Sequence, residues 1–249
     1  DYIQQNIFDG EQIENNIINI GFWPGGDRDG NPFVTPEITL KVAGRLRLSI
    51  IKNYYRNVRQ LKRKLTFQGV EDRMGNLERE LYSIITNEAS DLTLETFVSE
   101  LKEVKQIIID KHQSLYVDEL NSLINKTHLF GFHFANLDIR QDSRKHEQFF
   151  NDMVNALLES GSAVFPKNYH ELPEHEQIKI LSKVEGSVDL SLIKDEETLM
   201  ALETIKAIKT IQETNGEQAA NRYIISNNQS TLHVMQLFAM LKLVAFQDD

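Results

Sequence analysis

The sequence predicts a mostly helical protein that contains a few short parallel strands. Apolar residues recur with helical period over most of its 249 residues. Three short segments depart from that period and are predicted as strands, and each runs directly into polar residues: 19–23, 130–139 and 223–226. Because long helical stretches separate these strands, we expect parallel pairing through helical crossovers. Three strands are too few to close a barrel.

The predicted helices follow from apolar spacing and from residues typical of helix starts. The spacing of the isoleucines at positions 3, 7, 13, 17 and 20 predicts a first helix. A second helix begins at Thr35-Pro36-Glu37, which supplies an N-cap, a proline for the first helical position and an acid in the first turn. It continues to about residue 66. Further helices are predicted over residues 70–88, 94–127, 142–160, 174–184, 195–214 and 230–245.

The second helix has one apolar and one basic face. The apolar face carries Ala43, Ile50, Tyr54, Val58, Leu61 and Leu65. The opposite face carries Lys41, Arg45, Lys52, Arg56, Arg59 and Arg63, and no acid interrupts residues 41–64. Amphipathic helices on a protein surface normally show this pattern, so we expect a solvated face. A contact with an anion or RNA is the alternative.

Composition and charge limit the class of protein. A hydrophobic content of 41% and a charged content of 26% are typical of a soluble globular protein. The net charge of -10 argues against non-specific affinity for nucleic acid or anionic membrane. The absence of cysteine excludes disulfides, thiolate nucleophiles and cysteine-ligated metals, and favours a reducing cytosol. With no long apolar run and no signal segment at its start, the chain is expected to be soluble and cytoplasmic.

Both ends of the sequence suggest an internal fragment. The chain begins at Asp1, within a predicted helix, and stops shortly after the apolar residues 237–246. We therefore expect it to be a piece of a longer protein.

Residues 25–32 place two acids, one arginine and three glycines directly after the first predicted strand. Such a loop can hold itself rigid near a ligand through Asp–Arg pairing and backbone hydrogen bonds. An EF-hand is excluded because Pro32 would stand where glycine is required and Ile38 where the bidentate glutamate belongs. A phosphate loop is excluded because no Gly-Lys-Ser/Thr follows. A structural turn and a functional loop both remain open.

Arg140 is the best single candidate for a binding residue. It lies at the carboxyl end of the second predicted strand, where α/β folds place their ligands, and its guanidinium offers two parallel donors to a phosphate or carboxylate. Asp138, two residues earlier on the same strand face, is expected to orient it. A purely structural Asp–Arg pair is the alternative.

The histidines suggest no chemistry. His146 begins the following helix within a turn of Asp142 and Ser143, where we expect it to form a hydrogen bond on the helix surface. No pair of histidines has the spacing of a metal site. Two interpretations of the polar residues after the third predicted strand stay open. They form either a functional loop or a turn with an N-cap at Ser230-Thr231.

Three segments of the chain, residues 25–35, 137–146 and 223–226, together resemble the phosphoenolpyruvate carboxylase family. The family pattern Gly-Gly-Asp-Arg-Asp-Gly-Asn-Pro, followed by Val-Thr, is matched by residues 25–32 and Val34-Thr35. Its Leu-Asp-Ile-Arg-Gln-Glu-Ser pattern with a later histidine is similar to residues 137–143 and His146, with aspartate at position 142. The family's Tyr-Val-Ile-Ser strand is similar to residues 223–226, whereas residues 227–230 depart from its usual Met-Ala and Ser-Asp. The resemblance spans nearly the whole chain.

The resemblance implies a (β/α)8 barrel embedded in many helices, of which this chain is an incomplete central part. Residues 1–249 would then be an internal fragment of one larger catalytic domain, with no independent second domain. The implied reaction adds bicarbonate to phosphoenolpyruvate with Mg²⁺ or Mn²⁺ and yields oxaloacetate and phosphate. This anaplerotic enzyme would be cytoplasmic and a homo-oligomer at full length, with no nucleic-acid or membrane partner.

The resemblance also implies roles for particular residues. Arg140 would bind the substrate phosphate, whereas Asp27, Arg28 and Asp29 would line or brace the mouth of the barrel, and Asp138 would support the site. The family's catalytic histidine motif lies upstream of such a segment. Its acidic metal ligands, glycine-rich loop and further phosphate-binding arginines lie downstream. No catalytic residue and no metal ligand is therefore assigned here, and the isolated fragment is expected to be inactive.

Two other hypotheses compete with an active carboxylase. One is a non-catalytic helical scaffold or an RNA-binding module that uses the basic face of residues 41–63. The other is a degenerate family member that keeps the fold without turnover.

Overall fold

The computed structural model describes residues 18–29, 31 and 33–247. These residues form two compact units. The helical unit comprises residues 18–20 and 44–135, and the sheet unit comprises residues 21–43 and 136–247, within the described ranges. The isoleucine-spaced helix that we expect at the start lies at residues 1–17, outside the described residues.

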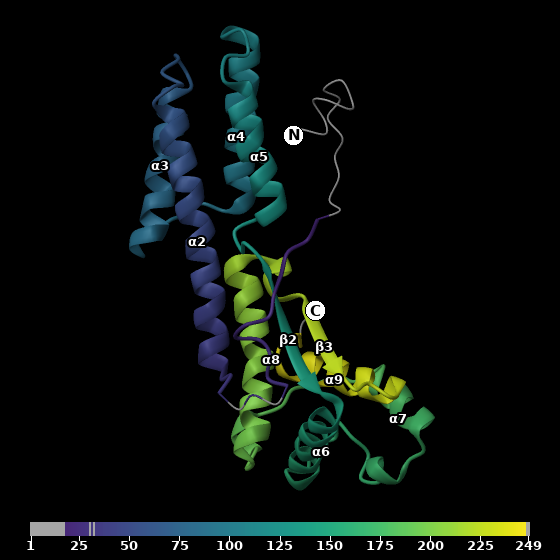
Figure 1. Cartoon of the computed structure of the whole chain (residues 1–249). Coiled ribbons are helices and arrows are strands. Elements are labelled where there is room, and N and C mark those ends of the chain that lie inside the picture. The colour runs from purple at the N-terminus through teal and green to yellow at the C-terminus, as the bar shows by residue number, and fades with distance from the viewer. Residues whose placement is uncertain (1–17, 30, 32, 248–249) are drawn as a thin grey trace. The chain divides into compact units, whose positions relative to one another are not determined.

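The helical unit packs four helices around one apolar core (Figure 1). They are the part of α2 (Pro36–Lys62) from Gly44 onward, α3 (Glu71–Thr86), α4 (Leu94–Lys111) and α5 (Val117–Phe130). Tyr54, Phe97 and Phe132 meet at its centre with ring centroids 5.5 to 6.2 Å apart. All six residues of the predicted apolar face of the second helix, from Ala43 to Leu65, are buried. None of the described helices has the length and apolarity required to cross a membrane.

The basic face of α2 is exposed, as predicted for a solvated face. All six of its predicted lysines and arginines are exposed. Glu78 of α3 lies 3.7 Å from Arg59 and 2.9 Å from Lys62, so an acidic neighbour within the same unit neutralises one end of this face.

Two predicted elements of the helical unit are wrong in their bounds. The predicted helix 94–127 is two helices, because Gln113, Ser114 and Tyr116 adopt positive φ between α4 and α5. The predicted strand 130–139 begins only at Asn136. Phe130, Phe132 and Phe134 belong to the core of the helical unit, so their alternation reflects packing of a turn rather than a strand.

The sheet unit contains three parallel strands, as predicted, and the structure arranges them in the order β1-β2-β3. They are β1 (Gly21–Phe22), β2 (Asn136–Asp142) and β3 (Arg222–Ser226). Helices α6 (Ser143–Glu159), α7 (Glu174–Leu181), α8 (Glu196–Asn215) and α9 (Thr231–Val244) accompany them, with 3-10 turns at Tyr169–Glu171, Leu190–Leu192 and Glu217–Ala220. The described strands form an open sheet, so the closed barrel stays a prediction.

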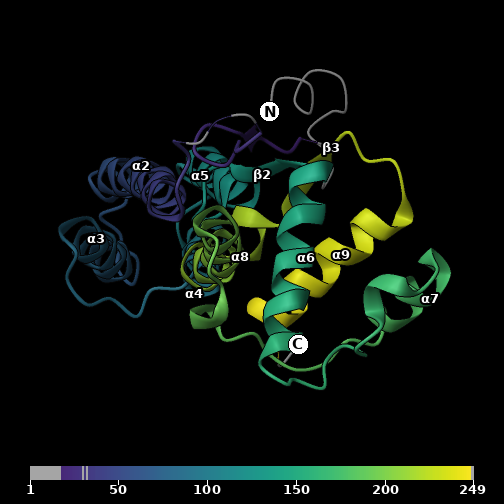
Figure 2. The ribbon, with the colours of Figure 1, turned by 90° about the horizontal axis from the view of Figure 1, so that it is seen from below.

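The two faces of this sheet differ in character because side chains alternate along each strand. Leu137 and Ile139 are fully buried against Ile208 and Ile211 of α8. Asp138 and Arg140 point to the opposite face, beside their register partners on β3, Arg222 and Ile224. A second core joins α6 to α9, which lie side by side in Figure 2.

The loop after β1 is held against β2 by its backbone. A turn follows β1. In this turn the N–H groups of Gly26 and Asp27 both donate to the Trp23 carbonyl. Gly25 has φ +85° and its carbonyl accepts a 2.7 Å hydrogen bond from the buried hydroxyl of Thr39. A Cβ at Gly26 would lie 2.2 Å from the Asp138 carbonyl oxygen, so only glycine allows this approach of loop and strand.

We expect Gly26→Ala to lower the free energy of unfolding by at least about 2 kcal/mol, because the added methyl group displaces the loop from β2. Gly44→Ala is the matched control. A Cβ at Gly44 meets no atom within 4 Å, and its position within a helix predicts a gain of about 0.5–1 kcal/mol. Urea denaturation of the two variants checks both values. Equal stability of Gly26→Ala and the parent would show that the loop is not held by this approach.

Candidate functional site

The candidate site lies at the carboxyl end of β2. The Arg140 N–H donates to the Gly26 carbonyl at 2.9 Å, and the Arg140 carbonyl accepts from the Arg28 N–H at 3.1 Å. The glycine-rich loop therefore continues the sheet as an isolated parallel bridge between Asp27 and Arg140. This pairing brings two sequence-predicted motifs, separated by more than 100 residues, to the same place.

Arg140 is oriented but keeps donors available. Its Nη1 lies 3.7 Å from Asp27 Oδ2, and its side chain is 39% exposed. Among the described residues, no hydrogen-bond partner reaches Arg140 Nε or Asp27 Oδ1. The long ion pair holds the guanidinium over the polar face of the sheet while leaving N–H groups that an anionic ligand can accept.

The residue that orients Arg140 is Asp27, and the expected role of Asp138 is corrected. Asp138 Oδ1 lies 3.1 Å from Arg222 Nε, on the neighbouring strand. The parallel register places Asp138 directly beside Arg222. The distance between neighbouring strands is shorter than the distance from Asp138 to Arg140, the next residue on the same face of β2. Arg222 crosses toward Gly21, where an added Cβ would lie 3.0 Å from its Nη2.

Arg28 braces the loop from the other side of the sheet. Its Nη1 donates to the Met200 carbonyl at 2.9 Å and to Thr204 Oγ1 at 2.6 Å, both on α8. Burial lowers the pKa of this guanidinium, although it stays charged at neutral pH. Asp29 follows at the rim and is exposed. Of the predicted residues, Asp27 and Arg140 therefore meet, whereas Arg28 is directed to α8.

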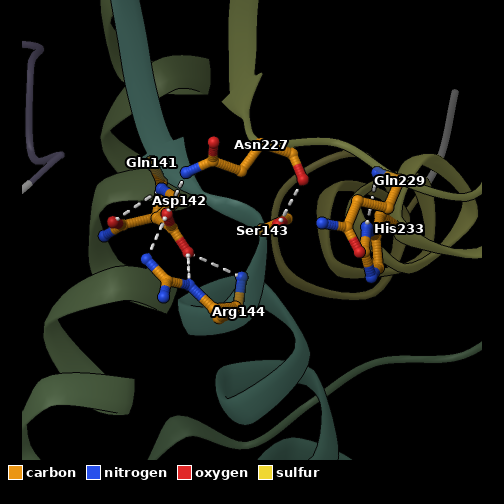
Figure 3. A network of polar contacts seen from close by, with 7 residues as sticks. All are labelled: Gln141, Asp142, Ser143, Arg144, Asn227, Gln229 and His233. Atoms are coloured by element: carbon orange, nitrogen blue, oxygen red, sulfur yellow. Dashed lines mark hydrogen bonds and ion pairs between the residues drawn. The ribbon is translucent and has the colours of Figure 1, made fainter.

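A polar network joins the exits of β2 and β3 (Figure 3). Asp142 caps α6 by accepting from the Arg144 N–H at 2.9 Å, and it also accepts from Arg144 Nε at 2.9 Å and Nη2 at 3.0 Å. Asn227 Nδ2 donates to Asp142 Oδ2 at 2.7 Å, and the Asn227 carbonyl accepts from the Ser143 hydroxyl at 2.8 Å. The hydrogen bonds from Arg144 and Asn227 hold the pKa of the Asp142 carboxyl far below its usual range. Asn227 adopts φ +52° to make these contacts.

The loop after β3 also contains the predicted helix cap. Ser230 is the N-cap of α9 and accepts from the His233 N–H at 3.4 Å. This confirms the N-cap interpretation for Ser230, while Asn227 adds the contacts to Asp142.

His146 does not form the hydrogen bond that we expect from its position. It is only 1% exposed, and neither ring nitrogen has a hydrogen-bond partner among the described residues. Its ring packs against Tyr223, with centroids 5.1 Å apart. Burial, with smaller contributions from His233 and Arg28, lowers the pKa of His146 to about 4, so it is neutral at pH 7.

Sequence reasoning missed three residues that the structure adds to this region. Arg222 precedes the predicted third strand, Thr204 lies mid-helix and Asn227 follows a strand. Only Asn227 carried a signal, since a polar residue at a strand exit is typical of α/β sites. The partners of Arg222 and Thr204 depend on strand register and helix placement.

The described residues do not fit a metal centre. No group of three His, Asp or Glu side chains among them is arranged to hold an ion. The nearest acids to Arg140 are engaged with arginines, so we derive no step through a metal at this site.

We expect Asp142→Asn to lower the free energy of unfolding by about 1 kcal/mol at pH 7, because the amide loses the charge-assisted bonds to Arg144 and Asn227. A carboxyl with a depressed pKa stabilises the fold above its unfolded pKa of 3.8, and this contribution is lost as the pH falls through the folded value. The difference should therefore be constant from pH 7 to about 5 and shrink below about pH 4. Urea denaturation across this range, with the exposed Asp91→Asn as control, measures it. A difference that is independent of pH would contradict this assignment.

Comparison with known proteins agrees with the motifs at this site. The family model for phosphoenolpyruvate carboxylase matches residues 1–95 and 71–249. A phosphoenolpyruvate carboxylase from Thermosynechococcus vestitus (strain NIES-2133 / IAM M-273 / BP-1) is 27% identical over 282 aligned residues, which cover 89% of this chain. The alignment covers 27% of that relative, so the chain spans about a quarter of its length. The chain belongs to the phosphoenolpyruvate carboxylase family.

Proposed function

We propose that the longer protein containing this chain is an active phosphoenolpyruvate carboxylase, a carbon–carbon lyase that joins bicarbonate and phosphoenolpyruvate to give oxaloacetate and phosphate. Family membership supports this reaction. The residues described here would form part of its substrate site, within one larger catalytic domain and a (β/α)8 barrel.

The observation that carries the proposal is the placement of Arg140. Its guanidinium stands at the carboxyl end of a parallel strand with exposed surface and an unpartnered Nε among the described residues. A phosphate oxygen pair matches the geometry of such a guanidinium. Arg140 would bind the phosphate of phosphoenolpyruvate, and Asp27 would keep the guanidinium on the polar face.

The remaining predicted residues would act through the scaffold. Arg28 fixes the loop to α8 through Met200 and Thr204, so it would maintain the position of Asp27. Asp138 would hold the sheet face through Arg222, and Asp29 would lie at the rim. We assign these residues to positioning, and none of them to a bond-making step.

The chemistry itself would need parts of the longer protein. In this family Mg²⁺ or Mn²⁺ would stabilise the enolate, and its ligands are expected outside residues 1–249. We therefore propose that the isolated segment is inactive. The full-length enzyme would be a cytoplasmic homo-oligomer that acts on phosphoenolpyruvate and bicarbonate, without nucleic acid or membrane partners.

The test is bicarbonate-dependent phosphate release from phosphoenolpyruvate, with Mg²⁺, by the protein from the uninterrupted reading frame. We expect Arg140→Ala to reduce kcat/KM at least about a hundredfold, because it removes charge-assisted bonds to the phosphate. Arg140→Lys should recover part of the loss, since it keeps the charge without the fork. Arg79→Ala, on the exposed side of α3, is the control. A folded but inactive parent would indicate the degenerate family member, and full activity of Arg140→Ala would remove Arg140 from the site.

A second candidate function is RNA binding through α2. It is favoured by Arg45, Lys52, Arg56 and Arg63, which are exposed and have no acidic partner within 4 Å among the described residues. We expect RNA binding, if it is a function, to weaken steeply with salt and to be lost in Arg56→Glu/Arg59→Glu. Filter binding of single-stranded RNA at 50 and 200 mM salt separates the two functions. Weak binding that this double variant leaves unchanged would eliminate the RNA hypothesis.

A further inference from the structure

Asp138 has two arginines near it on the polar face of the sheet. Arg140 follows on the same face of β2, about 6.6 Å further along the strand. Arg222 is the register partner of Asp138 on β3, and neighbouring strands lie only about 4.8 Å apart. The structure pairs Asp138 with Arg222, whose Nε lies 3.1 Å from Asp138 Oδ1. The Asp138 carboxylate is therefore engaged away from the candidate phosphate site.

The pair between Asp138 and Arg222 is held by charge rather than by an aligned hydrogen bond. Neither Asp138 Oδ1 nor Arg222 Nε has a hydrogen-bond partner among the described residues, although the two atoms are 3.1 Å apart. Of the residues that the structure describes, Arg222 alone forms an ion pair with Asp138. Removal of the Arg222 charge would therefore free the carboxylate to turn toward Arg140, on the same face of the strand.

The strands place Arg222 beside Asp138 independently of their charges. Asn136 Nδ2 donates to Asn221 Oδ1 at 3.2 Å, directly before Arg222, and this bond ties the start of β3 to β2. On β1, Gly21 leaves room for the guanidinium, because a Cβ there would lie 3.0 Å from Arg222 Nη2. All three strands thus contribute to the position of this side chain.

A second carboxylate beside Arg140 would oppose an anionic ligand. Arg140 Nη1 already lies 3.7 Å from Asp27 Oδ2, while its Nε has no hydrogen-bond partner among the described residues. Another carboxylate at this guanidinium would compete with a phosphate for the N–H groups and would repel the phosphate charge. We propose that Arg222 is a positioning residue, which keeps Asp138 away from Arg140 and so leaves that guanidinium open to the substrate phosphate. This inference rests on the proposed phosphate-binding role of Arg140.

Steady-state kinetics of the full-length protein, with phosphoenolpyruvate, bicarbonate and Mg²⁺, test the proposal. We expect Arg222→Met to raise the KM for phosphoenolpyruvate about tenfold and to change kcat less than about twofold, because the freed carboxylate weakens phosphate binding. The double variant Asp138→Asn/Arg222→Met should return KM to within about twofold of the parent, since no carboxylate is then free. Arg222→Lys keeps the charge and should resemble the parent. Arg73→Met is the matched control, because it removes an ion-paired arginine of similar exposure, 36% against 39%, from the helical unit.

Binding of inorganic phosphate to the same full-length proteins, measured by calorimetry, needs no turnover. The Kd should rise about tenfold in Arg222→Met and recover in the double variant. Unchanged KM and Kd in Arg222→Met would overturn the proposal. A double variant as weak as Arg222→Met would also overturn it, because Arg222 would then act only on the structure of the sheet.

The two measurements separate this inference from the carboxylase proposal. A parent that binds phosphate with this pattern among the variants, but without turnover, would remove the carboxylase proposal and support the role of Arg222. Because the Arg222 side chain is 39% exposed, we expect Arg222→Met to fold. Arg222→Gln, which also lacks the charge, repeats the test if the methionine variant does not fold.

Discussion

The candidate site depends on one interaction, the backbone pairing of the glycine-rich loop with Arg140. Two hydrogen bonds, from Arg140 N–H to Gly26 and from Arg28 N–H to Arg140, extend the sheet past the end of β1. They require the backbone of Gly26 to approach Asp138 more closely than any side chain would permit. This pairing places Asp27 in contact with Arg140 and directs the Arg28 side chain toward α8.

The polar face of the sheet is organised by pairs that run between strands. Asp138 pairs with Arg222 across β2 and β3, and Asp27 pairs with Arg140 across the loop and β2. Each acid is matched to an arginine on the adjacent strand or loop, because parallel register brings neighbouring strands closer than successive same-face residues. The Arg140 pair is the longer of the two, and this leaves its guanidinium suited to an additional anionic ligand.

Behind and beyond this face, α6 and α8 fix the ends of the strands. The Asp142 network ties the exit of β2 to that of β3 through Asn227 and Ser143. Arg28 anchors the loop to Thr204 of α8. Residues of the same elements and of the loop after β1 line a cavity that Gln141 also reaches.

The sequence by itself determined the class of fold, the parallel strands, the loop and Arg140 as the central candidate, because hydrophobic period, helix-start residues and family motifs are local patterns. It also predicted the buried face of α2. The break after α4 escaped it, since Gln113, Ser114 and Tyr116 adopt positive φ without a glycine. The turn at 131–135 does begin with a glycine, Gly131 at φ +49°, but the alternation of Phe130, Phe132 and Phe134 imitates a strand. Only the tertiary structure decided that Asp27 rather than Asp138 orients Arg140, that His146 is buried without a hydrogen bond among the described residues, and that Asn227 binds Asp142. These contacts depend on strand register and on where the helices pack, and the spacing of residues along the chain predicts neither.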